Sequence, residues 1–180
     1  KRELLALLLK EEIDRIDDQQ IRVTPRDGRS FPLSFSQQRL WFLDRLEPGS
    51  PLYNIPSAAR ITGKLSIPLL EESIHEVIRR HETLRTVFQE VNGEPVQRIL
   101  ESLNFSVDIL CLSKFTVLEK EDILAVKIQE NVRRTFRLDT APLFRVTCFI
   151  VNETESIILT VINHIIADGW SMGVLFKEIG

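Results

Sequence analysis

The run from Ile157 to Ile162 is the sequence feature that most constrains the fold. It has the length of a strand, is mostly β-branched, and carries one Thr among Ile, Leu and Val. Such a run predicts a strand buried on both faces at the centre of a sheet. It leads directly into Asn163 and His164. A strand end fixed by its neighbours is a good support for a titratable side chain, so His164 is the first candidate for proton transfer.

Length and composition limit the class of protein. The chain has 180 residues, of which 43% are hydrophobic and 27% charged, with a net charge of -3. These values predict one domain or lobe with a full core, and they argue against nucleic acid as a partner. No apolar run is long enough to cross a bilayer, and the first residues lack a signal-peptide cleavage site. Cys111 and Cys148 lie in or beside apolar runs, so we expect both to be reduced and buried in a cytoplasmic protein.

Helices and strands are mixed along the chain. We expect an amphipathic helix and a polar linker over residues 1–30, followed by a globular part over 31–180. In that part the expected helices are 34–46, one opening at Ser66 and Pro68, 121–137 and 170–179. The expected strands are 53–61, 85–91, 94–100, 104–110, 143–151 and 157–163, with Asn92-Gly93 marking a hairpin.

This order of elements predicts an α+β fold, an α/β sandwich in which helices pack on one mixed sheet. Trp41, Phe42 and His81 are interpreted as core residues. A zinc site is not expected, because His75 and His81 are the only other histidines and form no ligand cluster with His164 and Asp168.

Three blocks of sequence resemble one family and occur in its order. Residues 34–43 (SFSQQRLWFL) resemble the first core motif of the condensation domains of nonribosomal peptide synthetases. Residues 80–88 (RHETLRTVF) resemble the second motif. Residues 163–171 (NHIIADGWS) are similar to the third, His-His-x-x-x-Asp-Gly. We refer to them below as the first, second and third blocks.

The resemblance implies a lobe like chloramphenicol acetyltransferase. The family's full domain has two such lobes with the active site between them. Residues 31–180 are then expected to be the N-terminal lobe, with the C-terminal lobe absent. The chain stops inside its last expected helix, so we expect an excised fragment that is inactive alone.

The resemblance also implies amide-bond formation. Upstream and downstream peptidyl carrier proteins would present aminoacyl or peptidyl thioesters on phosphopantetheine, and no cofactor would bind the lobe directly. Adjacent synthetase domains and the missing C-terminal lobe would be further partners. His164 matches the second histidine of the third motif and would take or guide the proton of the attacking amine.

The remaining motif residues are given mainly structural roles by the same resemblance. Asn163 stands where the family has its first histidine and is expected to form a hydrogen bond within the lobe. Asp168 is expected to form a buried ion pair with Arg85 that shapes the loop. Gly169 is grouped with His164 at the catalytic position, as a residue that allows a backbone conformation or a close approach.

Two alternatives remain open at this stage. An epimerisation domain has the same fold and shares the third motif. A non-catalytic module that recruits carrier proteins is motivated by Asn163. Amide product, inverted stereochemistry or binding without turnover would distinguish the three functions.

Overall fold

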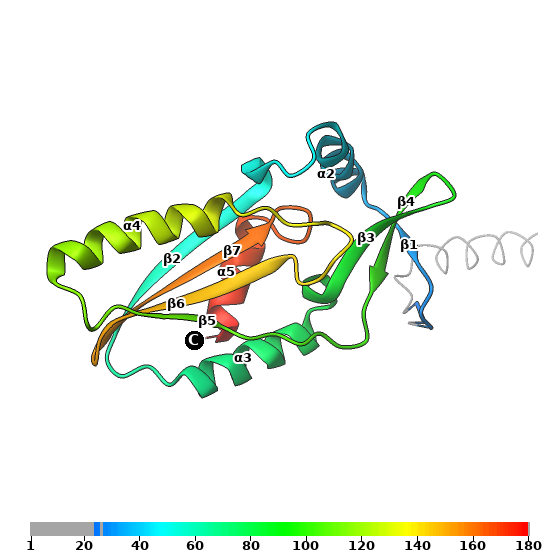
Figure 1. Cartoon of the computed structure of the whole chain (residues 1–180). Helices are drawn as coiled ribbons and strands as arrows, with labels where there is room; N and C mark the ends of the chain where they lie inside the picture. Colours follow the sequence, from blue (N-terminus) through cyan, green and yellow to red (C-terminus); the bar gives the residue numbers. More distant parts are fainter. Residues whose placement is uncertain (1–23, 26, 180) are drawn as a thin grey trace, which may run out of the picture.

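A four-stranded sheet forms the centre of the protein, in a computed structural model that describes residues 24–25 and 27–179 (Figure 1). Its strands are β2 (Asn54–Thr62), β7 (Glu155–Asn163), β6 (Phe144–Asn152) and β5 (Asp108–Cys111), in the order β2-β7-β6-β5. β7 pairs antiparallel with both of its neighbours, whereas β5 runs parallel to β6. The strand that leads to His164 is therefore internal, as its apolar run predicted.

A second, three-stranded sheet has the order β1-β4-β3. It contains β1 (Phe31–Pro32), β3 (Thr86–Val91) and β4 (Glu94–Ile99). The predicted hairpin at Asn92-Gly93 is confirmed, and both turn residues have positive φ, 54° and 83°. The prediction of a single mixed sheet is wrong, because β4 pairs with β1 on its second edge and not with a strand of the larger sheet.

Helices cover both faces of the four-stranded sheet. α4 packs on one face and α3 and α5 pack on the other (Figure 1). The helices are α2 (Phe35–Leu46), α3 (Ile67–Arg80), α4 (Val117–Arg133) and α5 (Gly169–Ile179), with short 3₁₀ turns η1 (Pro51–Tyr53) and η2 (Glu82–Arg85). This arrangement of mixed sheets and helices agrees with the α+β class expected from the sequence.

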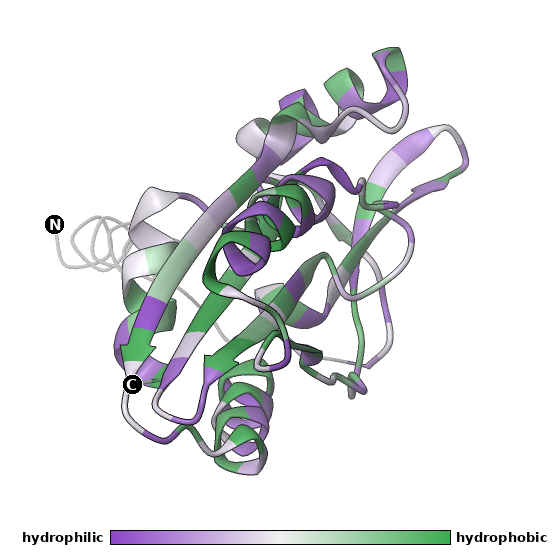
Figure 2. Ribbon diagram, turned by 60° about the vertical axis from the view of Figure 1, so that its left-hand side comes forward, coloured by the Kyte–Doolittle hydropathy of each residue, from purple (hydrophilic) through white to green (hydrophobic). Residues whose placement is uncertain are grey.

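Alternation along the central strands divides the core in two. Leu159 and Val161 point to the α4 side, whereas Ile162 points to the side of α3 and α5. Figure 2 shows hydrophobic residues along the central strands and both kinds of residue around the helices. A continuous apolar run is required in β7 because both of its faces are buried.

Two predicted elements differ from their expected bounds by more than one residue. The helix expected over 121–137 is α4, which begins at Val117 because Thr116 and Glu119 form a capping box there. Leu124, Ile128 and Val132 form its inner face. The strand expected over 104–110 begins only at Asp108.

The residues expected to be buried differ in their exposure. Phe42 is 63% exposed, because α2 lies at the side of the sheet and buries none of its residues fully. Trp41 is partly buried against the core. Cys148 is buried as predicted, but Cys111 is exposed at the end of an edge strand, and both thiols are free.

The predicted N-terminal helix and most of the 1–30 segment lie outside the described residues. Within residues 24–25 and 27–179, no helix is both long enough and apolar enough to span a membrane.

Candidate active site

The end of β7 is held on both sides by backbone hydrogen bonds. The Asn163 N–H donates to the Leu143 carbonyl at 2.9 Å, and the His164 N–H donates to the Tyr53 carbonyl at 2.8 Å. These contacts come from the segments that precede the two strands flanking β7. The position of the His164 backbone is therefore fixed by three strands and not by the loop that follows.

The His164 imidazole is oriented by its own loop. The side chain is exposed, and its Nδ1 lies 2.9 Å from the Ala167 carbonyl oxygen. A carbonyl oxygen can only accept a hydrogen bond, so the neutral ring carries its proton on Nδ1. No described residue forms a hydrogen bond with Nε2. The lone pair on Nε2 is thus free to accept a proton from a substrate.

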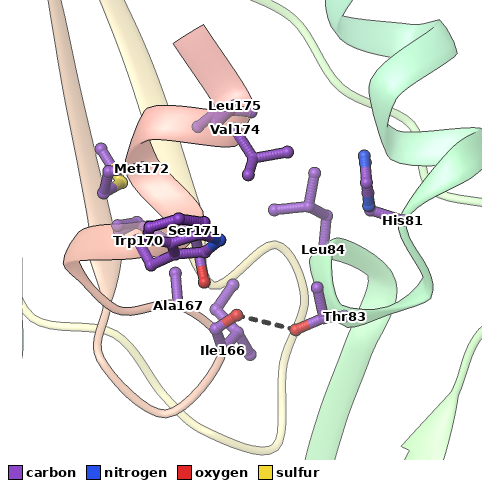
Figure 3. Close-up of a pocket in the computed structure, with 11 residues that line it drawn as sticks. His81, Thr83, Leu84, Ile166, Ala167, Trp170, Ser171, Met172, Val174 and Leu175 are labelled. Carbon is purple, nitrogen blue, oxygen red and sulfur yellow. Dashed lines mark hydrogen bonds between the residues drawn. The ribbon is translucent and has the colours of Figure 1, made fainter. Parts of the chain in front are cut away.

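All three sequence blocks meet at the turn that follows His164. Thr83 Oγ1, from the second block, donates to the Ile166 carbonyl at 2.7 Å, as Figure 3 shows. Gln37 Nε2, from the first block, donates to the Ile165 carbonyl at 3.5 Å, a long contact. The Gln37 Oε1 atom also accepts from the Ser34 N–H in the capping box of α2. Gln37 therefore connects the start of α2 to the histidine turn.

Gln37 and Thr83 were not among the predicted site residues. Both lie inside the recognised blocks, which is the one sequence signal that could have selected them. Their partners are 128 and 83 residues away along the chain, so no local pattern identifies the contacts.

Asn163 supports the same turn from inside the lobe. Its side chain is 7% exposed, and Oδ1 accepts a hydrogen bond from the Ile165 N–H at 3.0 Å. The predicted hydrogen bond within the lobe is confirmed. Asparagine at this position therefore closes a short local turn next to His164.

The predicted ion pair between Asp168 and Arg85 is wrong. Among the described residues, the exposed Asp168 carboxylate accepts hydrogen bonds from the Ser171 N–H at 2.8 Å and the Ser171 hydroxyl at 2.6 Å. The Arg85 guanidinium donates to the Leu100 carbonyl and lies 3.6 Å from Glu82. Asp168 thus caps the start of α5, and Arg85 bonds to η2 and to the end of the β3–β4 hairpin.

The environment of Asp168 favours its charged form. Hydrogen bonds from the Ser171 side chain and backbone lower the pKa of the Asp168 carboxyl, and the charge of His164 contributes a smaller effect.

Gly169 does not need its lack of a side chain within this lobe. It begins α5, its φ is not positive, and a Cβ built on it would meet no atom within 4 Å. The expected backbone constraint and close approach within the lobe are therefore wrong. What the structure has at Gly169 is open space beside the histidine turn.

A pocket of about 230 Å³ lies on the α5 side of this turn. It is mainly apolar, and Figure 3 shows residues of the turn, η2 and α5 around it, including Leu84, Trp170 and Leu175. His81 at its edge is partly exposed and lies 2.7 Å from Glu178 through Nε2, so its assignment to the core is wrong. Its hydrogen bond joins the end of α3 to the end of α5.

The described part of the chain has no candidate metal centre. There, no three or more His, Cys, Asp or Glu side chains are grouped so that they could hold a metal ion.

Comparison with known proteins identifies the family. The family model of the condensation domain matches residues 28–180. One component of the linear gramicidin synthase of Brevibacillus parabrevis is 42% identical over 160 residues, which cover 89% of this chain and 2% of that protein. The dimodular nonribosomal peptide synthase of Bacillus subtilis (strain 168) is 41% identical over 151 residues, covering 83% of this chain and 6% of the relative.

Solved structures agree on the fold. The starter condensation domain of rhizomide synthetase RzmA superposes with a TM-score of 0.77 at 23% identity, covering 84% of this chain and 38% of that one. Holo-AB3403, a four-domain nonribosomal peptide synthetase, gives a TM-score of 0.74 at 22% identity. The match covers 89% of this chain and 12% of the Holo-AB3403 chain. The chain thus spans well under two thirds of each of these proteins. With the three blocks, the fold and the family model in agreement, the chain belongs to the condensation domain family of nonribosomal peptide synthetases.

Proposed function

We propose that this chain provides the histidine-bearing lobe of a condensation domain that joins two carrier-bound acyl groups by an amide bond. The observation that carries the proposal is the contact between His164 Nδ1 and the Ala167 carbonyl. That contact leaves Nε2 on the side of the ring away from the Ala167 carbonyl, and its lone pair has no partner among the described residues. A base in this tautomer suits deprotonation of an attacking amine.

The reaction involves one amine and one thioester. The amine nitrogen of the downstream aminoacyl group attacks the carbonyl carbon of the upstream aminoacyl or peptidyl thioester. The C–N bond forms and the C–S bond breaks, which gives an amide and a free thiol. The proton lost by the amine moves through His164 Nε2 to the thiolate that leaves. A well-placed general base contributes on the order of 10²–10⁴-fold in rate, and orientation of the two substrates adds to this.

Gly169 is assigned to the same site through its surroundings. It lies at the first position of α5, where backbone N–H groups have no acceptor within the helix. The open space beside its Cα would admit a substrate group next to His164. Asn163, Gln37 and Thr83 then serve to hold the turn, and they do not take part in the chemistry.

The partners follow from this reaction. Upstream and downstream peptidyl carrier proteins would present their substrates on phosphopantetheine, and other domains of a synthetase would adjoin this one. The free thiols of Cys111 and Cys148 support a reducing compartment, so we place the reaction in the cytoplasm.

The test is single-turnover amide formation by a complete condensation domain that contains these residues, with both carriers loaded. His164→Ala is expected to lower the rate by about 10²-fold or more. His75→Ala is the matched control, because His75 is an exposed histidine on α3 whose ring contacts Phe105. An unchanged rate for His164→Ala would remove His164 from the mechanism.

The same assay separates the alternatives. Products with an inverted donor centre and no new amide would indicate epimerisation. Carrier binding without any product from the unmodified domain would indicate a recruitment module.

A further inference from the structure

Arg145 is a buried cation on the other side of the sheet from the pocket beside His164. It lies on β6 opposite Val161, on the face covered by α4, and is only 8% exposed. Its guanidinium lies 3.8 Å from the centre of the Phe136 ring, and Nη2 donates to the Arg134 carbonyl at the end of α4. A cation at a helix C-terminus is favourable, and this contact explains part of the arginine's placement.

The helix end does not satisfy the whole guanidinium group. Its Nε atom is buried and has no hydrogen-bond partner among the described residues, and none of their carboxylates forms an ion pair with Arg145. Burial, together with the positive charge of Arg134, lowers the pKa of Arg145 to about 10, while Asp108 acts in the opposite direction. Arg145 therefore remains charged at neutral pH with incomplete compensation, which is costly in a protein interior.

A pocket of about 430 Å³ lies where Arg145 is placed. β5 pairs with β6 only from Thr147 onward, so the start of β6 has no strand partner on that side in the described part of the chain. The pocket occupies this end of the sheet, and Ser106, Thr135 and Asn104 contribute polar side chains to its lining.

Three arginines line the pocket, and they differ in their pairing. The Arg137 guanidinium is bound to the Asp139 carboxylate at 2.8 Å. Within residues 24–25 and 27–179, neither Arg134 nor Arg145 forms an ion pair. Asp108 is the single carboxylate among the pocket's lining residues, so the lining carries more positive than negative charge.

We propose that this pocket binds a phosphate group, either free or as an ester. Arg134 and Arg145 would supply planar sets of N–H donors, which fit the oxygens of a phosphate better than a single ammonium group does. The hydroxyls of Ser106 and Thr135 would bind further oxygens. The bound anion would also compensate the charge of Arg145, which the fold leaves incompletely paired. This site is separate from the His164 chemistry and does not depend on it.

The experiment is a titration of the chain with inorganic phosphate, followed by thermal unfolding and by ¹H–¹⁵N spectra, against chloride at the same ionic strength. Phosphate is expected to raise the Tm and to shift the signals of residues lining the pocket. Arg134→Gln should weaken binding about tenfold, as expected for one lost charge-assisted hydrogen bond. Arg134 is exposed, so this variant avoids the unfolding that removal of Arg145 would risk.

Arg137→Gln is the matched control, because this arginine lines the same pocket but is already paired. It should retain the affinity of the unmodified chain. Equal weakening by both variants would indicate nonspecific attraction and would overturn the proposal, as would the absence of any difference between phosphate and chloride. A parallel titration with phosphopantetheine identifies the source: tighter binding than inorganic phosphate indicates an ester, and equal or weaker binding indicates free phosphate.

Discussion

Thr83→Val tests whether the second block holds the histidine turn. The substitution keeps the shape of the side chain and removes the hydroxyl that donates to the Ile166 carbonyl at 2.7 Å. Ile166 is only 5% exposed, so water replaces that donor poorly. An unpaired carbonyl in such a place costs about 1–3 kcal/mol of unfolding free energy. For a chain of this size, that loss lowers the Tm by roughly 2–12 °C.

Thr83→Ser is the control, because it keeps the hydroxyl and removes one methyl group from an exposed residue, worth at most about 0.8 kcal/mol. Stability is measured by thermal and denaturant unfolding of all three proteins. A second measurement, the ¹⁵N shifts of the His164 ring, reports whether the proton stays on Nδ1 when the turn loosens. Valine is expected to lower stability and to mix the tautomers, whereas serine should do neither to a comparable degree. Equal stability of the valine variant and the unmodified chain would refute the reasoning.

Three further predictions concern the third block. Asp168→Ala should lower the Tm at neutral pH through loss of the α5 cap. The hydrogen bonds from Ser171 lower the pKa of Asp168 in the folded state, so the carboxylate stabilises the fold above the unfolded pKa of about 4, and this stabilisation disappears as pH falls through the folded pKa. The Tm of the alanine variant should therefore depend less on pH in that acid range. Identical curves of Tm against pH for the variant and the unmodified chain would contradict this. Asn163→His should change single-turnover amide formation little, since Asn163 bonds within the lobe, and a large gain would mean that asparagine limits the site. Gly169→Ala should not lower the Tm, because its Cβ meets no atom and alanine suits a helical backbone, but it should slow amide formation in a complete domain; full turnover would remove Gly169 from the site.

The pairing of Asp168 illustrates how a correct motif can lead to a wrong contact. The resemblance placed Asp168 and Arg85 in one ion pair, yet Asp168 bonds to Ser171 in its own segment and Arg85 bonds to Leu100 after the β3–β4 hairpin. A cap needs only a carboxylate three residues before an N–H, so Asp168 and Ser171 meet as soon as α5 forms. The ion pair would require Asp168 and the mostly buried Arg85 side chain, which belong to different elements, to leave these partners.

The sequence alone did not predict which aromatic residue of α2 is buried. Trp41 and Phe42 are adjacent on α2, and both were expected in the core, but only Trp41 packs against it. Neighbours on a helix point about 100° apart, so the choice between them depends on which side of α2 the sheet lies. That side is decided by packing and not by composition.

The sequence by itself determined the elements whose signals are local. The apolar run of β7, the Asn92-Gly93 hairpin and the inner face of α4 were all predictable, because period, β-branching and turn residues act over a few neighbouring positions. The three blocks likewise determined the family. Tertiary structure alone decided that Thr83 and Gln37 hold the histidine turn, that β4 belongs to a separate sheet and that no described carboxylate forms an ion pair with Arg145. These outcomes depend on which distant segments the packed core brings together, and that information is not carried by the spacing of residues along the chain.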